Sequence, residues 1–211
     1  AVCLVMVPLV VYAASYLPLL AGSGRGLDRI VTDQLSMFSY HAGMAETRWY
    51  ASTWWEWPLD VRPIWLAADT VGVAAGWVAS IVAMGNPVLW WAGVVAMLAA
   101  GALAWRKGDR VAAFVAGLFA SLYLPWVVAP RQLLFIYHYL PCVPFLALAL
   151  VHLWLRARAR LGVAATRPVG WAFLGAVALA FALFYPILAG VPVPREWAQA
   201  LRWLDSWVFF G

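Results

Sequence analysis

Two groups of polar residues interrupt a chain that is otherwise strongly apolar, and the first group surrounds Arg131 and His138. On a helix these two side chains would share a face with Phe135 and Cys142, at spacings of four, three and four residues. A guanidinium is a planar fork that fits phosphate oxygens, and ionisable groups inside membrane segments commonly serve function. The pattern is therefore suited to phosphate binding. The alternatives are an arginine that reaches lipid headgroups and a histidine satisfied inside a helix bundle.

The second group lies in a polar and aromatic loop over residues 33–65. Glu56, Asp60 and Arg62 stand there among four tryptophans, at positions 54, 55, 57 and 65. Aromatic rings beside carboxylates suit the hydroxyl groups of a sugar. Tryptophan near a membrane surface is more often an anchor, so both interpretations remain open for this loop.

Other common site patterns are absent from the sequence. It has no glycine-rich phosphate loop, no paired-cysteine zinc spacing and no nucleophile elbow. Cys3 and Cys142 both lie inside apolar runs, which indicates buried free thiols and not a disulfide framework. We predict no metal site.

Composition places the chain in a membrane. Hydrophobic residues make up 66% and charged residues 11%, whereas soluble domains have roughly 45–50% and about 25%. The net charge of +5 comes almost wholly from arginine, with Lys107 the only lysine. No basic stripe with exposed aromatic residues is present, so the charge indicates orientation in a membrane and not nucleic-acid binding.

Apolar runs of spanning length predict an all-α polytopic membrane protein, with residues 1–211 as one domain fragment. Two further segments have apolar residues at helical spacing and polar residues opposite, which predicts interfacial helices at 27–42 and 195–208. Between the spans we expect an external loop, and after the last span an external C-terminal tail. The expected spans are 2–20, 87–105, 111–129, 133–154 and 169–189, the loop is 21–86 and the tail is 190–211.

Residues 64–82 leave two alternatives open. The segment is apolar, but it is rich in alanine and glycine and contains Asp69, which costs about 2.5–3.5 kcal/mol at the centre of a spanning helix. Without a span here, seven basic residues lie inside and seven outside; with one, the bias becomes eleven to three. Charge therefore favours a sixth span and hydrophobicity opposes it.

The chain begins inside an apolar run, without a charged leader or a cleavage site. We therefore expect upstream sequence in the parent protein.

Four blocks carry a resemblance to a known family. They are Gln34-Leu35-Ser36-Met37-Phe38-Ser39-Tyr40-His41, Trp55-Glu56-Trp57-Pro58-Leu59-Asp60-Val61-Arg62-Pro63, Gly85-Asn86-Pro87-Val88-Leu89-Trp90-Trp91 and His138-Tyr139-Leu140-Pro141. In this order they resemble the C-terminal region of the dolichyl- or polyprenyl-phosphate-mannose–protein O-mannosyltransferases. The resemblance implies a GT-C type helical bundle, with about five spans in this fragment. It also implies that 64–82 stays external, as in the bacterial form with its short loop.

The resemblance further implies an enzyme of the bacterial plasma membrane with its active site on the extracytoplasmic side. It would transfer mannose, with inversion, from a polyprenyl-phosphate carrier to Ser or Thr hydroxyls of translocating polypeptides. The family's catalytic Asp-Glu pair belongs to the first external loop, which lies outside this fragment. No cofactor is expected, and a dimer or an association with the translocon is left open.

Site roles follow from that chemistry. Arg131, His138 and Tyr137 would bind the phosphate of the donor, although packing or membrane anchoring is the stronger alternative for Tyr137. The residues expected to contact the acceptor or the sugar are Gln34, His41, Glu56, Asp60 and Arg62.

Two other functions remain as alternatives. One is a GT-C transferase that modifies a lipid or a glycan, because fold does not determine function. The other is a transporter or a structural membrane subunit. The absence of an internal repeat and the external position of the polar groups oppose this second alternative.

Overall fold

The computed structural model describes residues 2–23, 26, 28–44, 48–69, 72–131 and 133–210. These fall into two units. The first comprises Ala1–Glu46 with Pro130–Gln132, and the second comprises Thr47–Ala129 with Leu133–Gly211.

The first unit contains helices α1 (Val2–Ala14), α2 (Leu17–Ser23) and α3 (Asp28–Gly43). A turn at residues 15–16 divides the predicted span 2–20 into two helices, α1 and α2. Proline has no N–H and its ring clashes with the carbonyl four residues earlier. Pro18 stands four residues after Ala14, where α1 ends. The predicted amphipathic helix 27–42 is present as α3.

Helices of membrane-spanning length belong to the second unit. Among the described residues, four stretches are long and apolar enough to cross a membrane: Pro87–Lys107, Arg110–Val128, Ile136–Leu161 and Val163–Ala189. They coincide with the last four predicted spans. They comprise α4 (Pro87–Lys107), α5 (Arg110–Tyr123), α6 (Pro125–Val128), the 3₁₀ helix η2 (Ile136–Cys142), α7 (Val143–Leu161) and α8 (Val163–Ala189).

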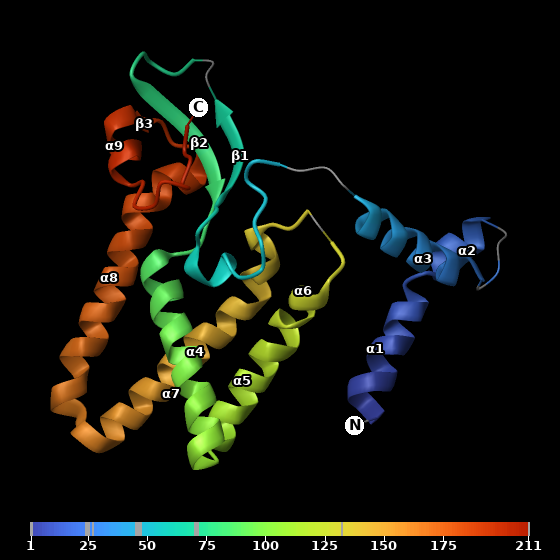
Figure 1. Cartoon of the computed structure of the whole chain (residues 1–211), viewed down its shortest axis with the longest axis horizontal. Helices are drawn as coiled ribbons and strands as arrows, with labels where there is room; N and C mark the ends of the chain where they lie inside the picture. The colour runs from blue at the N-terminus through green and yellow to red at the C-terminus, as the bar shows by residue number, and fades with distance from the viewer. Residues whose placement is uncertain are drawn as a thin grey trace. The chain divides into compact units, whose positions relative to one another are not determined.

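The α4–α5 and α7–α8 connections lie at the same end of the bundle (Figure 1). Asp109, the N-cap of α5, accepts hydrogen bonds from the Ala112 amide at 3.0 Å and pairs with His152 at 2.9 Å and with Arg156. The Ala112 amide, followed by His152, lowers the pKa of the Asp109 carboxyl. One carboxylate thus joins the two basic connections, so the basic clusters 106–110 and 156–167 share one face.

Residues 64–83 form a β-hairpin at the opposite end of the second unit (Figure 1). Strand β1 (Ile64–Asp69) pairs antiparallel with β2 (Trp77–Ala83), and β2 also pairs with β3 (Val193–Pro194). The described residues of this segment, 64–69 and 72–83, contain no spanning helix, as the resemblance implied, although the sequence did not predict a sheet. One face of β2 is buried, because β2 packs against α8.

The C-terminal tail differs from its prediction. The helix α9 covers only Arg195–Ala200, so the predicted helix 195–208 is wrong beyond residue 200. The remaining residues turn back into a second apolar core, in which Trp207 and Phe209 pack on Val82 and Phe184. Burial of two large aromatic side chains in this core favours the turn over a helix lying flat on a membrane.

Candidate functional site

The site is built on the aromatic loop, residues 48–63, which packs against α4, α5 and η2. Trp57 opens the 3₁₀ helix η1 (Trp57–Leu59) and is fully buried. Its indole donates to the Ser52 hydroxyl at 3.0 Å and stacks on the His138 ring with centroids 5.7 Å apart. The Ser52 amide in turn donates to the Leu134 carbonyl at 2.9 Å. Two of the predicted blocks, the tryptophan loop and the histidine block, are thus in direct contact.

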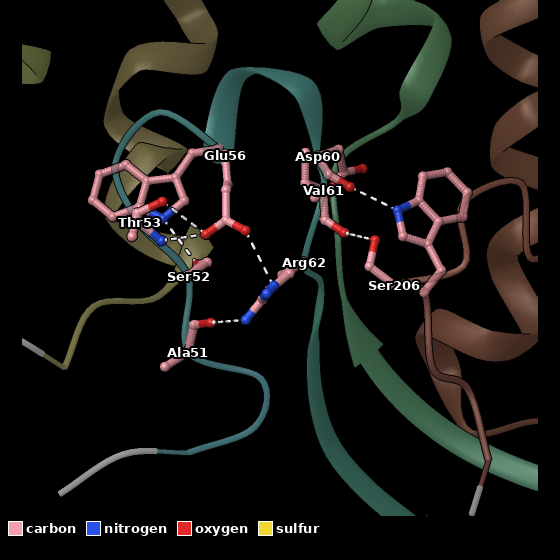
Figure 2. A network of polar contacts seen from close by, with 10 residues as sticks. Ala51, Ser52, Thr53, Glu56, Asp60, Val61, Arg62 and Ser206 are labelled. Atoms are coloured by element: carbon pink, nitrogen blue, oxygen red, sulfur yellow. Dashed lines mark hydrogen bonds and ion pairs between the residues drawn. The ribbon is translucent and has the colours of Figure 1, made fainter.

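Glu56 and Arg62 form the polar centre of this loop (Figure 2). The Glu56 carboxylate accepts hydrogen bonds from the Thr53 amide at 2.6 Å and the Thr53 hydroxyl at 2.8 Å. Its other oxygen lies 3.1 Å from Nε of Arg62. The Glu56 side chain is 6% exposed and that of Arg62 is 48% exposed. A buried carboxylate therefore holds a half-exposed guanidinium in one orientation.

Arg62 keeps hydrogen-bonding capacity in this arrangement. Its Nη1 points to the Ala51 carbonyl at 3.5 Å, a long contact, and its Nε is used by Glu56. A guanidinium has five N–H donors, so the exposed side of the Arg62 fork can still donate to an anion or to sugar hydroxyls. Glu56, by contrast, has its oxygens occupied within the loop.

Asp60 lies at the end of η1 and has no exposed surface. Its backbone is left-handed, with φ 54°, a conformation that Asp and Asn tolerate better than most side chains. Burial raises the pKa of the Asp60 carboxyl to about 8, and the Gly85 backbone acts in the opposite direction. Among the described residues, neither carboxylate oxygen forms a hydrogen bond of ordinary geometry. In this structure a sugar or peptide cannot touch Asp60, which instead fixes the loop from within.

The C-terminal tail closes the inner side of the loop (Figure 2). The Trp207 indole donates to the Asp60 carbonyl at 2.7 Å, and the Ser206 hydroxyl donates to the Val61 carbonyl. Sequence reasoning missed these two residues. Their partners are backbone carbonyls in a loop more than a hundred positions away, and such contacts leave no spacing signal in one sequence.

The Gly85-Asn86-Pro87 block turns the chain from the hairpin into α4. Asn86 caps α4 by accepting from the Leu89 amide at 3.2 Å, and its side-chain amide donates to the Val177 carbonyl of α8 at 2.9 Å. Gly85 is required by close packing: a Cβ there would lie 2.2 Å from the Trp90 ring. This block therefore aligns α4, α8 and the loop.

Replacing Gly85 by alanine tests this close approach. The added methyl would overlap a buried ring, and overpacking of this kind costs about 1–3 kcal/mol. We expect Gly85→Ala to lower the midpoint of thermal unfolding of the detergent-purified full-length protein by several degrees. Gly101→Ala, where no heavy atom lies within 4 Å of the added Cβ, is the matched control. An unchanged midpoint in Gly85→Ala would contradict the packing.

His138 and Tyr137 lie in η2, not in an α-helix. His138 Nδ1 is 2.8 Å from the Phe135 carbonyl, and its ring lies 4.3 Å from both Trp126 and Tyr137 between centroids. Tyr137 is 44% exposed and lines an apolar cavity of about 320 Å³, together with residues of β1, β2, α4 and α8. The histidine is thus enclosed by aromatic rings, while Tyr137 faces an open apolar space.

The predicted face shared by Arg131, Phe135, His138 and Cys142 is wrong. Ala129, before Pro130, is extended at ψ 124°, because the residue before a proline disfavours the α-region. Among the described residues 129–131 and 133–135 none is helical, and the next helix begins at Ile136. Arg131 also groups with the first unit. Its Nε is buried and has no hydrogen-bond partner among the residues that the structure describes.

Gln34 and His41 belong to α3 of the first unit. The Gln34 side chain donates to the Tyr16 hydroxyl of the same unit. His41 is exposed and packs edge-on against Tyr40, with centroids 5.3 Å apart. Within the described residues, no group of three or more His, Cys, Asp or Glu side chains is arranged to hold a metal ion.

Comparison with known proteins shows the family of this chain. The model of the C-terminal four-transmembrane region of protein O-mannosyltransferases matches residues 27–207. The chain belongs to the protein O-mannosyltransferase family. The family region thus takes in α3, the aromatic loop, the hairpin and all four spanning helices.

Named relatives agree with that assignment. The chain is similar to the polyprenol-phosphate-mannose–protein mannosyltransferase of Mycobacterium tuberculosis, at 26% identity over 96% of this chain and 45% of the relative. It is also similar to that of Corynebacterium glutamicum, at 26% identity over 82% of this chain and 36% of the relative. The chain therefore spans less than half the length of these relatives.

A solved structure shares the fold of this O-mannosyltransferase region. It is the Saccharomyces cerevisiae protein O-mannosyltransferase Pmt1-Pmt2 complex bound to the sugar donor. The match has a TM-score of 0.65 and 23% identity, over 87% of this chain and 27% of that chain. The likeness confirms the predicted GT-C helical membrane fold.

Proposed function

We propose that this chain is the C-terminal part of an enzyme that transfers mannose from a polyprenyl-phosphate carrier to Ser or Thr hydroxyls of exported proteins. The observation that carries the proposal is the family match over residues 27–207, which takes in the aromatic loop and all four spanning helices. Relatives named for this activity support it. The bacterial plasma membrane and an active site on its extracytoplasmic side belong to the same proposal.

The reaction makes two demands on the protein. The acceptor oxygen attacks the anomeric carbon of mannose as the bond to the carrier phosphate breaks, and a carboxylate takes the hydroxyl proton. The departing polyprenyl phosphate gains negative charge, which cations and N–H donors stabilise. We propose that the carboxylate comes from upstream sequence and that this chain supplies groups for the donor and the acceptor.

Arg131 is our candidate for the carrier phosphate. Its Nε is buried and has no partner among the described residues, which supports the assignment. A buried donor without a hydrogen bond costs about 1–3 kcal/mol, so such a donor commonly binds a ligand or water. Tyr137 and the apolar cavity of about 320 Å³ beside it suit part of the isoprenoid chain. His138, enclosed by aromatic rings, would position Tyr137 next to that cavity.

Arg62, held by Glu56, is our candidate for contact with the sugar or the acceptor. The exposed side of its fork supports this role. Gln34 and His41 remain proposed acceptor contacts of the first unit. Asp60 would contribute to sugar or acceptor binding indirectly, by holding the aromatic loop in its conformation. A dimer is a further proposal, supported by the two-protein assembly of the yeast relative.

The proposal is tested by transfer of labelled mannose from polyprenyl-phosphate-mannose to a Ser/Thr-rich peptide, in membranes that contain the full-length protein. We expect alkali-labile mannose on the peptide. We expect Arg131→Ala to lower the rate by about tenfold, because a hydrogen bond to a charged group is worth about 1.5 kcal/mol or more.

Arg106→Ala, an exposed arginine at the end of α4, is the matched control and should keep the wild-type rate. Full activity in Arg131→Ala would remove the phosphate role of Arg131 and leave the family activity intact. No transfer by well-folded wild-type protein would move the proposal to a different acceptor or sugar.

A further inference from the structure

A second cavity runs from the basic end of the bundle along α7 and α8. Its volume is about 780 Å³, and its walls come from α7 and α8, with Leu89 of α4. The two helices diverge from their common turn at Gly162 (Figure 1). We call this space the α7–α8 groove. From Arg158 to Ala147 it follows α7 for about 16 Å, which suits an extended hydrocarbon chain.

The walls of the α7–α8 groove are apolar and one of them is close-packed. Leu150, Val151 and Leu174 face the space. A Cβ on Gly170 would lie 3.1 Å from Trp154 Nε1, so the small glycine lets the Trp154 indole lie directly against α8. In this part of the groove, α7 and α8 are therefore in direct contact through Trp154 and Gly170.

Two arginines line the groove near its turn. Arg158 of α7 and Arg167 of α8 both belong to its lining and are exposed. The Arg158 guanidinium lies 5.3 Å from the Trp154 ring centroid, a cation–π contact that holds the charge against the wall. Among the described residues, neither arginine forms an ion pair.

Acidic partners for these arginines are scarce at this end of the bundle. Asp109 is the one acidic residue in the clusters 106–110 and 156–167, which hold seven basic residues. It is already bonded to His152 and Arg156. An anion from outside the chain is therefore the natural partner of Arg158 and Arg167.

We propose that the α7–α8 groove binds one anionic phospholipid, with an acyl chain along the apolar wall and the phosphate between Arg158 and Arg167. An apolar helix from another protein segment would fill the wall but leave both guanidinium groups without an anion. A phospholipid supplies both an acyl chain for the wall and a phosphate for the two arginines. The groove shares no lining residue with the cavity beside Tyr137.

The test is photo-crosslinking in nanodiscs that contain the full-length protein. The probes are phosphatidylglycerol and phosphatidylcholine carrying the same diazirine acyl chain, and labelled peptides are identified by mass spectrometry. We expect phosphatidylglycerol to label residues 147–174 about fivefold or more above phosphatidylcholine, because each basic residue near anionic lipid contributes a favourable charge interaction.

Two variants separate the groove from the basic surface around it. Arg158→Gln with Arg167→Gln should remove the preference for phosphatidylglycerol, and because both side chains are exposed the protein should still fold. Arg106→Gln with Lys107→Gln, at the same end but outside the groove, should preserve it. Equal labelling by both lipids, equal loss in both variants, or no label in 147–174 would overturn the proposal; the last result would mean that protein covers the groove.

Discussion

Replacing Arg62 by alanine is expected to lower mannose transfer by about a hundredfold. Two losses combine in this variant. The exposed guanidinium that we assign to the sugar or acceptor disappears, and hydrogen bonds to charged groups are worth about 1.5–3 kcal/mol. The Glu56 carboxylate, which is 6% exposed, also loses its ion pair with Arg62, and removing one member of a buried pair is costly. Rates are measured with labelled donor and normalised to folded protein by size-exclusion chromatography.

Three further variants separate the two losses. Arg62→Lys keeps the positive charge but cannot reproduce the fork geometry, so we expect only partial rescue. Glu56→Gln frees the guanidinium from its anchor and should raise KM more than it lowers kcat, since the charge remains but its position does not. Arg106→Ala is the remote control. If Arg62→Ala transfers mannose at the wild-type rate per folded molecule, Arg62 is structural and the site assignment is wrong.

Much of the fold follows from apolar run length and from the charges between runs. Each of the last four predicted spans overlaps a stretch that is long and apolar enough to cross a membrane. A bilayer admits continuous helices and excludes unpaired backbone groups. Asn before Pro commonly turns a chain, and Asn86 does so here, where it caps α4 by accepting from the Leu89 amide.

Errors occurred where proline and small residues alter the backbone locally. The residue before Pro130 is extended, so a helical face drawn from Arg131 to His138 does not exist. In the connection between β1 and β2, Gly72 and Gly76 adopt positive φ of 81°. The two strands are too short for hydropathy to distinguish them from helix. The effect of a proline also varies with its position, since Pro8 and Pro186 lie inside α1 and α8 whereas Pro130 follows the end of α6.

The sequence identified the blocks but did not predict which of them would be in contact. In the structure the tryptophan loop, the Gly85-Asn86-Pro87 turn and the histidine block meet around Trp57 and Trp90. Sequence could not show that Glu56 points inward to Arg62, that Asp60 is sealed by Trp207, or that Arg131 groups with the first unit. Each of these depends on which side of a short turn the side chain leaves the backbone.

Asp60→Asn is expected to stabilise the protein, and to do so more strongly as the pH rises. In the unfolded chain this carboxyl ionises near pH 3.8, whereas in the folded protein burial raises its pKa to about 8. Between these values the folded state holds a proton that the unfolded state has released, so the wild-type free energy of unfolding falls with rising pH. At about 1.4 kcal/mol per unit, the penalty amounts to roughly 4 kcal/mol at pH 7. Asparagine has the same shape, tolerates positive φ and does not ionise.

The measurement is the midpoint of thermal unfolding of purified full-length protein between pH 4.5 and pH 8.5, for wild type and variant together. Because all other titrating groups are shared, only the difference between the two curves reports on Asp60. We expect a small difference at pH 4.5 that widens to several degrees near pH 8 and then levels off. Asp205→Asn, which replaces an exposed carboxylate in the C-terminal tail, is the control. Parallel curves for Asp60→Asn would show that Asp60 is ionised and paired in the folded protein, whereas a widening difference with reduced mannose transfer would show that the buried acid serves activity at the expense of stability.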